Sequence, residues 1–125
     1  MAPGTLLLAL VLLTAPSSAA DTPELRAGIR LVEEGDLEGA VAALQQALRG
    51  LERAPGRVQA QAHLYLAMAY LGLGDLDPAR DHMRAVWKHD PDLVLDAREY
   101  APPVMALYRD ARPPAVTAQI GRAHV

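Results

Sequence analysis

The sequence lacks several residue types on which whole classes of protein depend. It contains no cysteine, so a disulfide framework, a thiolate zinc site and a cysteine nucleophile are all excluded. Its only serines, Ser17 and Ser18, lie near the amino terminus, which leaves the rest of the chain without the usual nucleophile of acyl-enzyme chemistry. The chain also has no excess of positive charge, because it contains 12 Lys and Arg and 15 Asp and Glu, which gives a net charge of −3. Nucleic acid is therefore not an expected partner.

Charge is absent from residues 1–20 altogether. An apolar stretch from Leu6 to Leu13 is followed there by Ser18 and two alanines, a layout typical of a secretory signal peptide cleaved before Asp21, although no basic residue precedes it. A loosely buried helix is the alternative. The stretch is too short to span a bilayer, which needs about 20 apolar residues. We therefore expect an exported protein, periplasmic or secreted, with no membrane span after removal of the signal.

The carboxyl-terminal residues 113–125 are expected to form a disordered tail. The last six of them, residues 120–125 (Ile-Gly-Arg-Ala-His-Val), resemble the translation of a sequencing adapter that ends at a stop codon. A polar tail of the natural protein is the alternative. If the adapter interpretation holds, the natural chain continues beyond Gln119. The expected folded domain is then residues 21–112, large enough for one small core.

A turn signal occurs twice, 39 residues apart, as Gly35-Asp36-Leu37 and Gly74-Asp75-Leu76, each with an alanine three residues after the leucine. In each copy an apolar helical stretch leads to a glycine that can take a positive φ and end the helix. The aspartate that follows can cap the next helix. The pattern predicts two hairpins of antiparallel helices.

Apolar spacing of three and four residues supports helices on both sides of each turn. Thr22-Pro23-Glu24 predicts a helix start, and further helices are expected over residues 37–48, 57–73, 76–89 and 102–112. Breaks are expected at Pro55 and Pro91. Leu93 and Leu95 are expected to pack on the end of the second hairpin. The predicted fold class is all-α.

With these features the chain resembles the tetratricopeptide repeat (TPR) family. The 34-residue pattern of that family fits residues 60–93 through Leu66, Tyr70, Gly74, Ala79 and Pro91. Residues 21–54 fit less closely, through Gly28, Gly35, Ala40, Leu44 and Ala47. The resemblance implies a short α-solenoid of stacked hairpins, closed by a capping helix, and a non-catalytic adaptor or scaffold that binds protein.

The resemblance also implies where a partner would bind, because the first helix of each hairpin lines the concave surface in this family. The large apolar side chains at those positions are the candidate partner-binding residues: Leu25, Ile29, Val32, Leu64, Tyr65, Met68 and Leu71. Either a segment of another protein docks there, or the helix over residues 102–112 covers this surface as an internal cap. The partner's identity and self-association are left open. The alternative function is a binding or sensing domain of a longer protein whose activity lies in a missing carboxyl-terminal part.

Catalytic or metal chemistry has little support in the sequence. His82 and His89 are seven residues apart and share a helix face, but no zinc-binding spacing is present. His63 occupies a repeat position that usually packs in or beside the core. Arg53 and Arg57 form only a weak candidate for a carboxylate or phosphate clamp. We expect no enzyme activity, no cofactor, no metal and no catalytic residue.

Overall fold

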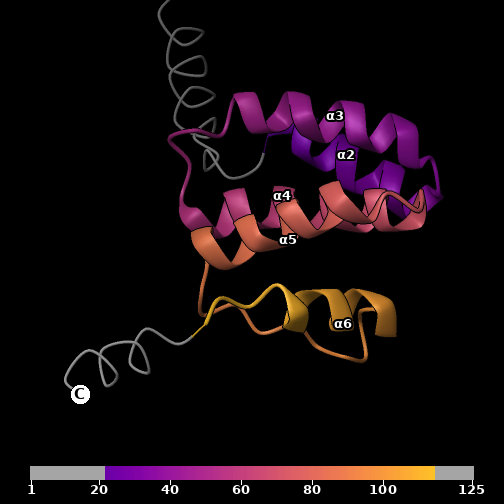
Figure 1. Ribbon diagram of the computed structural model, residues 1–125. Coiled ribbons are helices and arrows are strands. Elements are labelled where there is room, and N and C mark those ends of the chain that lie inside the picture. Colours follow the sequence, from indigo (N-terminus) through magenta and orange to yellow (C-terminus); the bar gives the residue numbers. More distant parts are fainter. Residues whose placement is uncertain (1–21, 115–125) are drawn as a thin grey trace, which may run out of the picture.

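The computed structural model describes residues 22–114, which form helices and connecting segments without a strand (Figure 1). The helices are α2 (Pro23–Glu34), α3 (Leu37–Arg49), α4 (Gly56–Gly72), α5 (Leu76–His89) and α6 (Pro102–Asp110). The predicted all-α fold class is confirmed. None of these helices combines the length and apolar character that crossing a membrane requires. The predicted signal peptide and the adapter-like residues 120–125 lie outside the described residues.

Helix starts follow the predicted caps with one exception. The Thr22 hydroxyl accepts a hydrogen bond of 3.2 Å from the Leu25 amide, and Pro23 occupies the first turn of α2. The Asp36 carboxylate accepts one of 3.1 Å from the Gly39 amide at the start of α3. Asp75 precedes α5 in the same way, but its side chain makes no capping bond, so that prediction is wrong.

Both hairpin turns have the predicted left-handed glycine. Gly35 has a φ of 85° and Gly74 one of 81°, and they are the positive-φ residues of the described chain. In each turn the amide after the glycine donates over 2.9 Å to the carbonyl oxygen five residues earlier. This bond, typical of a Schellman motif, satisfies a carbonyl that the helix end would otherwise leave unpaired.

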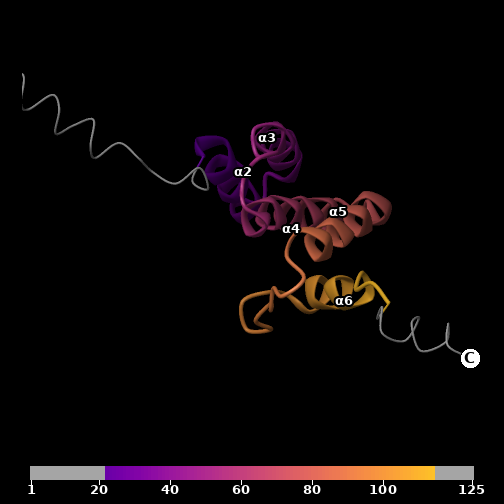
Figure 2. The ribbon, with the colours of Figure 1, turned by 90° about the vertical axis from the view of Figure 1, so that its left-hand side faces the viewer.

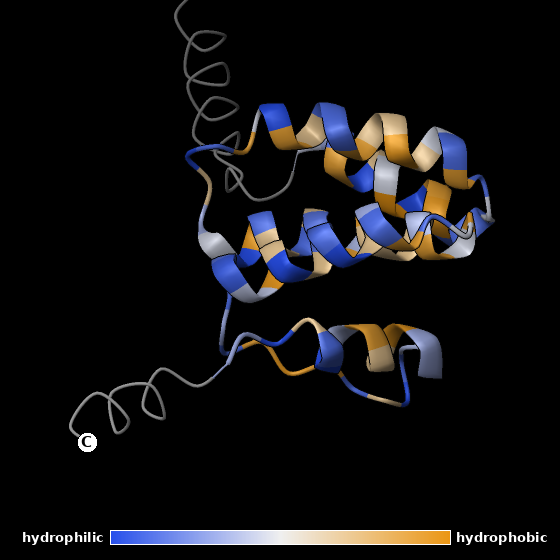
Figure 3. Cartoon of the chain, viewed as in Figure 1, coloured by the Kyte–Doolittle hydropathy of each residue, from blue (hydrophilic) through white to orange (hydrophobic). Residues whose placement is uncertain are grey.

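The helices form successive layers, with α2 and α3 in the first, α4 and α5 in the second, and α6 in the third (Figures 1 and 2). Each helix packs against the next one along the chain from α2 to α6, and α2 also packs against α4. Polar and apolar stretches alternate along the helices, so a helix can bury one side and expose another (Figure 3). The expected stack of antiparallel hairpins is confirmed.

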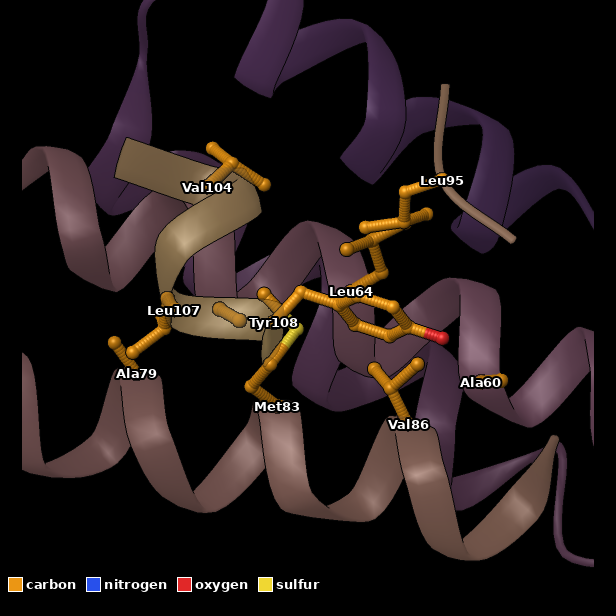
Figure 4. Close-up of a cluster of buried hydrophobic side chains, with 10 residues drawn as sticks. Ala60, Leu64, Ala79, Met83, Val86, Leu95, Val104, Leu107 and Tyr108 are labelled. Atoms are coloured by element: carbon orange, nitrogen blue, oxygen red, sulfur yellow. The ribbon is translucent and has the colours of Figure 1, made fainter. Parts of the chain in front are cut away.

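Two hydrophobic clusters fill the spaces between the layers. The first joins α2, α3 and α4 and contains the fully buried Leu44 and Leu66. The second joins α4, α5 and α6 and contains Met83, Val86 and Leu107 (Figure 4). Helix α4 contributes to both, with Val58, Ala62, Leu66 and Ala69 in the first cluster and Ala60, Leu64 and Ala67 in the second.

The chain after α5 closes the second cluster. Leu95 is 7 % exposed and Leu93 is half-buried against the cluster, as predicted. The Trp87 indole donates a hydrogen bond of 2.7 Å to the Tyr108 carbonyl oxygen, and the two rings stack with centroids 4.3 Å apart. The Tyr108 hydroxyl in turn donates to the Leu93 carbonyl oxygen. These bonds fix α6 to α5, and α6 ends two residues earlier than predicted.

Candidate functional site

The predicted partner-binding residues divide into two groups by exposure. Leu25 is 2 % exposed and Leu64 3 %, so both side chains belong to the hydrophobic clusters and offer almost no surface to a partner. The prediction needs correction at these two positions. Leu64 belongs to the second cluster together with Leu95 and Val104, and all three are drawn in Figure 4. The other five residues are half-buried.

Those five residues, Ile29, Val32, Tyr65, Met68 and Leu71, are called the α2–α4 face below. Ile29, Val32 and Tyr65 rest on the first cluster, and Met68 and Leu71 on the second. Part of each side chain supports the core and part remains accessible. All five side chains lie on α2 and α4, which pack against each other. A partner would therefore meet apolar groups that the folded core already holds in place.

One end of the α2–α4 face carries negative charge. Tyr65 lies near Tyr100, which belongs to the segment between α5 and α6. The pKa of the Tyr65 hydroxyl is raised by burial and by its neighbours, Tyr100 first and then Glu33 and Glu99. Two carboxylates from different segments thus lie near one half-buried tyrosine. Neutral or cationic groups are favoured there over anionic ones.

A cleft of about 390 Å³ lies between the start of α4 and the segment that follows α5. Arg57, Gln61 and Leu64 of α4 line one side, and residues 93–96 with Glu99 and Tyr100 line the other. Val94, at its rim, is 86 % exposed. Arg57 was a weak candidate from the sequence, whereas Glu99 and Tyr100 were missed. The repeat pattern gives no signal for them, because the chain leaves the repeat register after Pro91.

The extra helix covers the predicted surface only in part. Helix α6 packs against α5 and supplies Val104, Leu107 and Tyr108 to the second cluster. Leu64 belongs to this same cluster, whereas the five residues of the α2–α4 face are half-buried. Coverage by the last helix, one of the two alternatives from the sequence, therefore applies to the Leu64 side of this surface. Docking of a segment of another protein, the other alternative, applies to the α2–α4 face.

Three histidines come together between α4 and α5. The Nδ1 atoms of His63 and His82 lie 2.9 Å apart, and the ring of His63 also stacks on that of His89. Burial lowers the pKa of His63 to about 4, and the charges of His82 and His89 act in the same direction. Burial also lowers the pKa of His82, against an opposite effect of Asp81. His63 is half-buried, as predicted, but its contact with the other two histidines was not expected.

Comparison with protein families gives one relevant result. A family model described as tetratricopeptide repeat matches residues 31–101, more than half of the chain, from the middle of α2 to the residue before α6. No curated protein and no solved structure matches the chain.

Proposed function

The chain belongs to the tetratricopeptide repeat family, and from that premise we propose that it is a scaffold or adaptor that binds a protein segment along the α2–α4 face. Repeats of this family generally mediate protein–protein interaction, on a fold that is itself non-catalytic. The observation that carries the proposal is the set of five large apolar side chains that the packed helices α2 and α4 hold half-buried, three against the first cluster and two against the second. Large apolar side chains that stay accessible on neighbouring helices are typical of interaction sites.

The chemistry of the surface describes the segment that fits it. Ile29, Val32 and Met68 favour aliphatic or aromatic side chains, whose burial contributes roughly 25 cal/mol per Å² of apolar area removed from water. Glu33 and Glu99 beside Tyr65 favour a lysine or arginine at one end of the segment. We therefore propose an apolar segment with a basic flank, bound in an extended or helical conformation.

The place of this interaction is proposed from the sequence alone. The uncharged segment over residues 1–20 supports export and action outside the cytoplasm, in the periplasm or as a secreted protein. Mass spectrometry of the protein from its source should then find an amino terminus at Asp21. A mature chain that still begins at Met1 would contradict export by this route.

The binding experiment uses peptides selected on the full chain from a random display library. Met68→Glu places a charge in the middle of the α2–α4 face without emptying the core, since Met68 is half-buried. The matched control is Leu76→Glu, a similar change at an exposed residue (46 %) in the second hairpin turn. Circular dichroism should show both variants folded.

The expected result is a set of peptides that carry apolar residues beside Lys or Arg, and whose affinity falls at least about tenfold in Met68→Glu and stays unchanged in Leu76→Glu. A tenfold loss corresponds to about 1.4 kcal/mol of binding free energy. Equal binding by the two variants would place the peptide site elsewhere and refute the proposal. Peptides with an acidic flank would refute the part of it that concerns charge.

A further inference from the structure

Aromatic rings from two helices alternate in a row along the junction of α4 and α5. His89 of α5 stacks on His63 of α4, with centroids 5.3 Å apart and an interplanar angle of 7°. His63 lies against His82 of α5 at 5.2 Å, and His82 stacks on Tyr70 of α4 at 5.6 Å and 7°. Gln45 of α3 donates a hydrogen bond of 2.9 Å to the Tyr70 hydroxyl. The rings of His63 and His82 are therefore each held by a second ring.

The Nδ1 atoms of His63 and His82 lie 2.9 Å apart and form a hydrogen bond, in which one ring donates and the other accepts. One of the two nitrogens therefore carries a proton, and the other presents a lone pair. Two N–H groups, or two imidazolium ions, would repel each other at that distance. The accepting nitrogen already directs its lone pair at the other ring, and the donating nitrogen gains a lone pair when its proton moves to Nε2.

The spacing of the two nitrogens suits a shared metal ion. Imidazole nitrogens bind transition metals at about 2.0–2.1 Å. Two such bonds at a right angle place the nitrogens roughly 2.9 Å apart, and at the tetrahedral angle roughly 3.3–3.4 Å. The hydrogen bond holds the two nitrogens at 2.9 Å, which is also their separation at the right angle that square-planar or tetragonal Cu²⁺ and Ni²⁺ prefer. Of these, Cu²⁺ binds nitrogen ligands more tightly.

We propose that His63 and His82 form a binding site for one Cu²⁺ ion through their Nδ1 atoms. The described residues offer no group of three histidine, cysteine or acidic side chains arranged for a metal, so water would occupy the remaining positions. Asp81 adds negative charge beside His82, which favours a bound cation, although this carboxylate also pairs with Arg84 at 2.9 Å. The protein would therefore supply two of the ligands.

The proposed site is independent of the proposed protein-binding surface. It joins α4 to α5 and extends towards α3 through Tyr70 and Gln45. The α2–α4 face instead extends towards Tyr100 in the segment after α5, and the two share no residue. A bound Cu²⁺ would add a cross-link within the second hairpin and stabilise it by mass action. Failure of one proposal therefore leaves the other untouched.

The test measures Cu²⁺ binding to the untagged full chain after treatment with a chelator. Isothermal titration should give one tight ion per chain, and the electron paramagnetic resonance spectrum should show coupling to two nitrogens. His63→Gln and His82→Gln should each weaken binding at least tenfold. His89→Gln removes a stacking neighbour and keeps both Nδ1 atoms, so it should keep the two-nitrogen spectrum with a smaller loss of affinity. His124→Gln, which removes the one histidine outside the row, should change nothing.

Several results would overturn the proposal. One is a wild-type affinity for Cu²⁺ no greater than that of His63→Gln and His82→Gln. Another is a spectrum in which His124→Gln, rather than His63→Gln, removes the nitrogen coupling. Circular dichroism is recorded for every variant. If His63→Gln or His82→Gln does not fold, the wild-type spectrum decides, since two coupled nitrogens support the site and none refutes it.

Discussion

Acidification should destabilise this protein through His63. Its pKa is about 4 in the folded chain and 6.5 ordinarily, because burial and the neighbouring His82 and His89 disfavour the charged ring. Between these two values the unfolded chain binds more protons than the folded one, so the free energy of unfolding falls as the pH falls from about 6.5 towards 4. The lowered pKa of His82 acts in the same direction.

The magnitude follows from the same two pKa values. The two pKa values alone would lower the free energy of unfolding by roughly 2 kcal/mol between pH 7 and pH 5. Because the His63 ring is only half-buried, solvent screening reduces the expected decrease to about 1 kcal/mol. For a domain of this size that is a decrease in Tm of about 4–8 °C. Urea unfolding followed by circular dichroism at pH 7, 6 and 5, with a chelator present to exclude metal, measures it.

His63→Gln provides the control, because it removes the titrating ring. Its stability should change less than that of the wild type between pH 7 and pH 5, by about the 1 kcal/mol assigned to His63. Parallel pH profiles for the two proteins would refute the reasoning. A wild type that becomes more stable from pH 7 to pH 5 would show the opposite of the expected change and would also refute the reasoning.

Three further changes test how the helices pack. Gly56→Ala should destabilise the chain by about 1–3 kcal/mol, because the new methyl group would overlap the His89 carbonyl oxygen. The control Gly50→Ala should be nearly neutral, because the atom nearest to its new methyl group lies 3.6 Å away. Thermal unfolding compares the stability of the two variants. Gly74→Val should cost at least about 1–2 kcal/mol in urea unfolding, since its φ of 81° suits valine poorly, and Gly74→Asn should recover much of the loss. Leu44→Ala, at a fully buried position, should cost about 2–5 kcal/mol, and a Tm within 2 °C of the wild type would contradict its place in the core.

The part of the fold that the sequence predicts is the part that local chemistry decides. The positive φ of Gly35 and Gly74 follows from the need to end a helix and reverse direction within a few residues. The cap at Thr22 depends on neighbours three residues away, and it is present as predicted. The helix bounds around these turns agree with expectation to within one residue, with α4 beginning and ending one residue early.

The errors concern contacts between segments that lie far apart in the sequence. Repeat position does not reveal that Leu64 joins Leu95 and Val104 in one buried cluster. The histidine row was missed for the same reason, because helical spacing relates His82 to His89 whereas only the pairing of α4 with α5 brings in His63. Leu95 and Val104 lie after the last repeat, where the pattern gives no register. The histidines lie inside the second repeat, but a predicted pair of helices does not by itself determine which side chains meet across it.

Helix α4 buries side chains towards both neighbouring layers, and this has a consequence for how the protein opens. Separating either hairpin from the stack would expose one apolar side of α4 to water, so local unfolding of either hairpin requires a large free energy. The backbone amides of α4 should therefore exchange with solvent deuterium only on global unfolding. Those of α6, which has a packed layer on one side, should exchange through smaller openings and become labelled first.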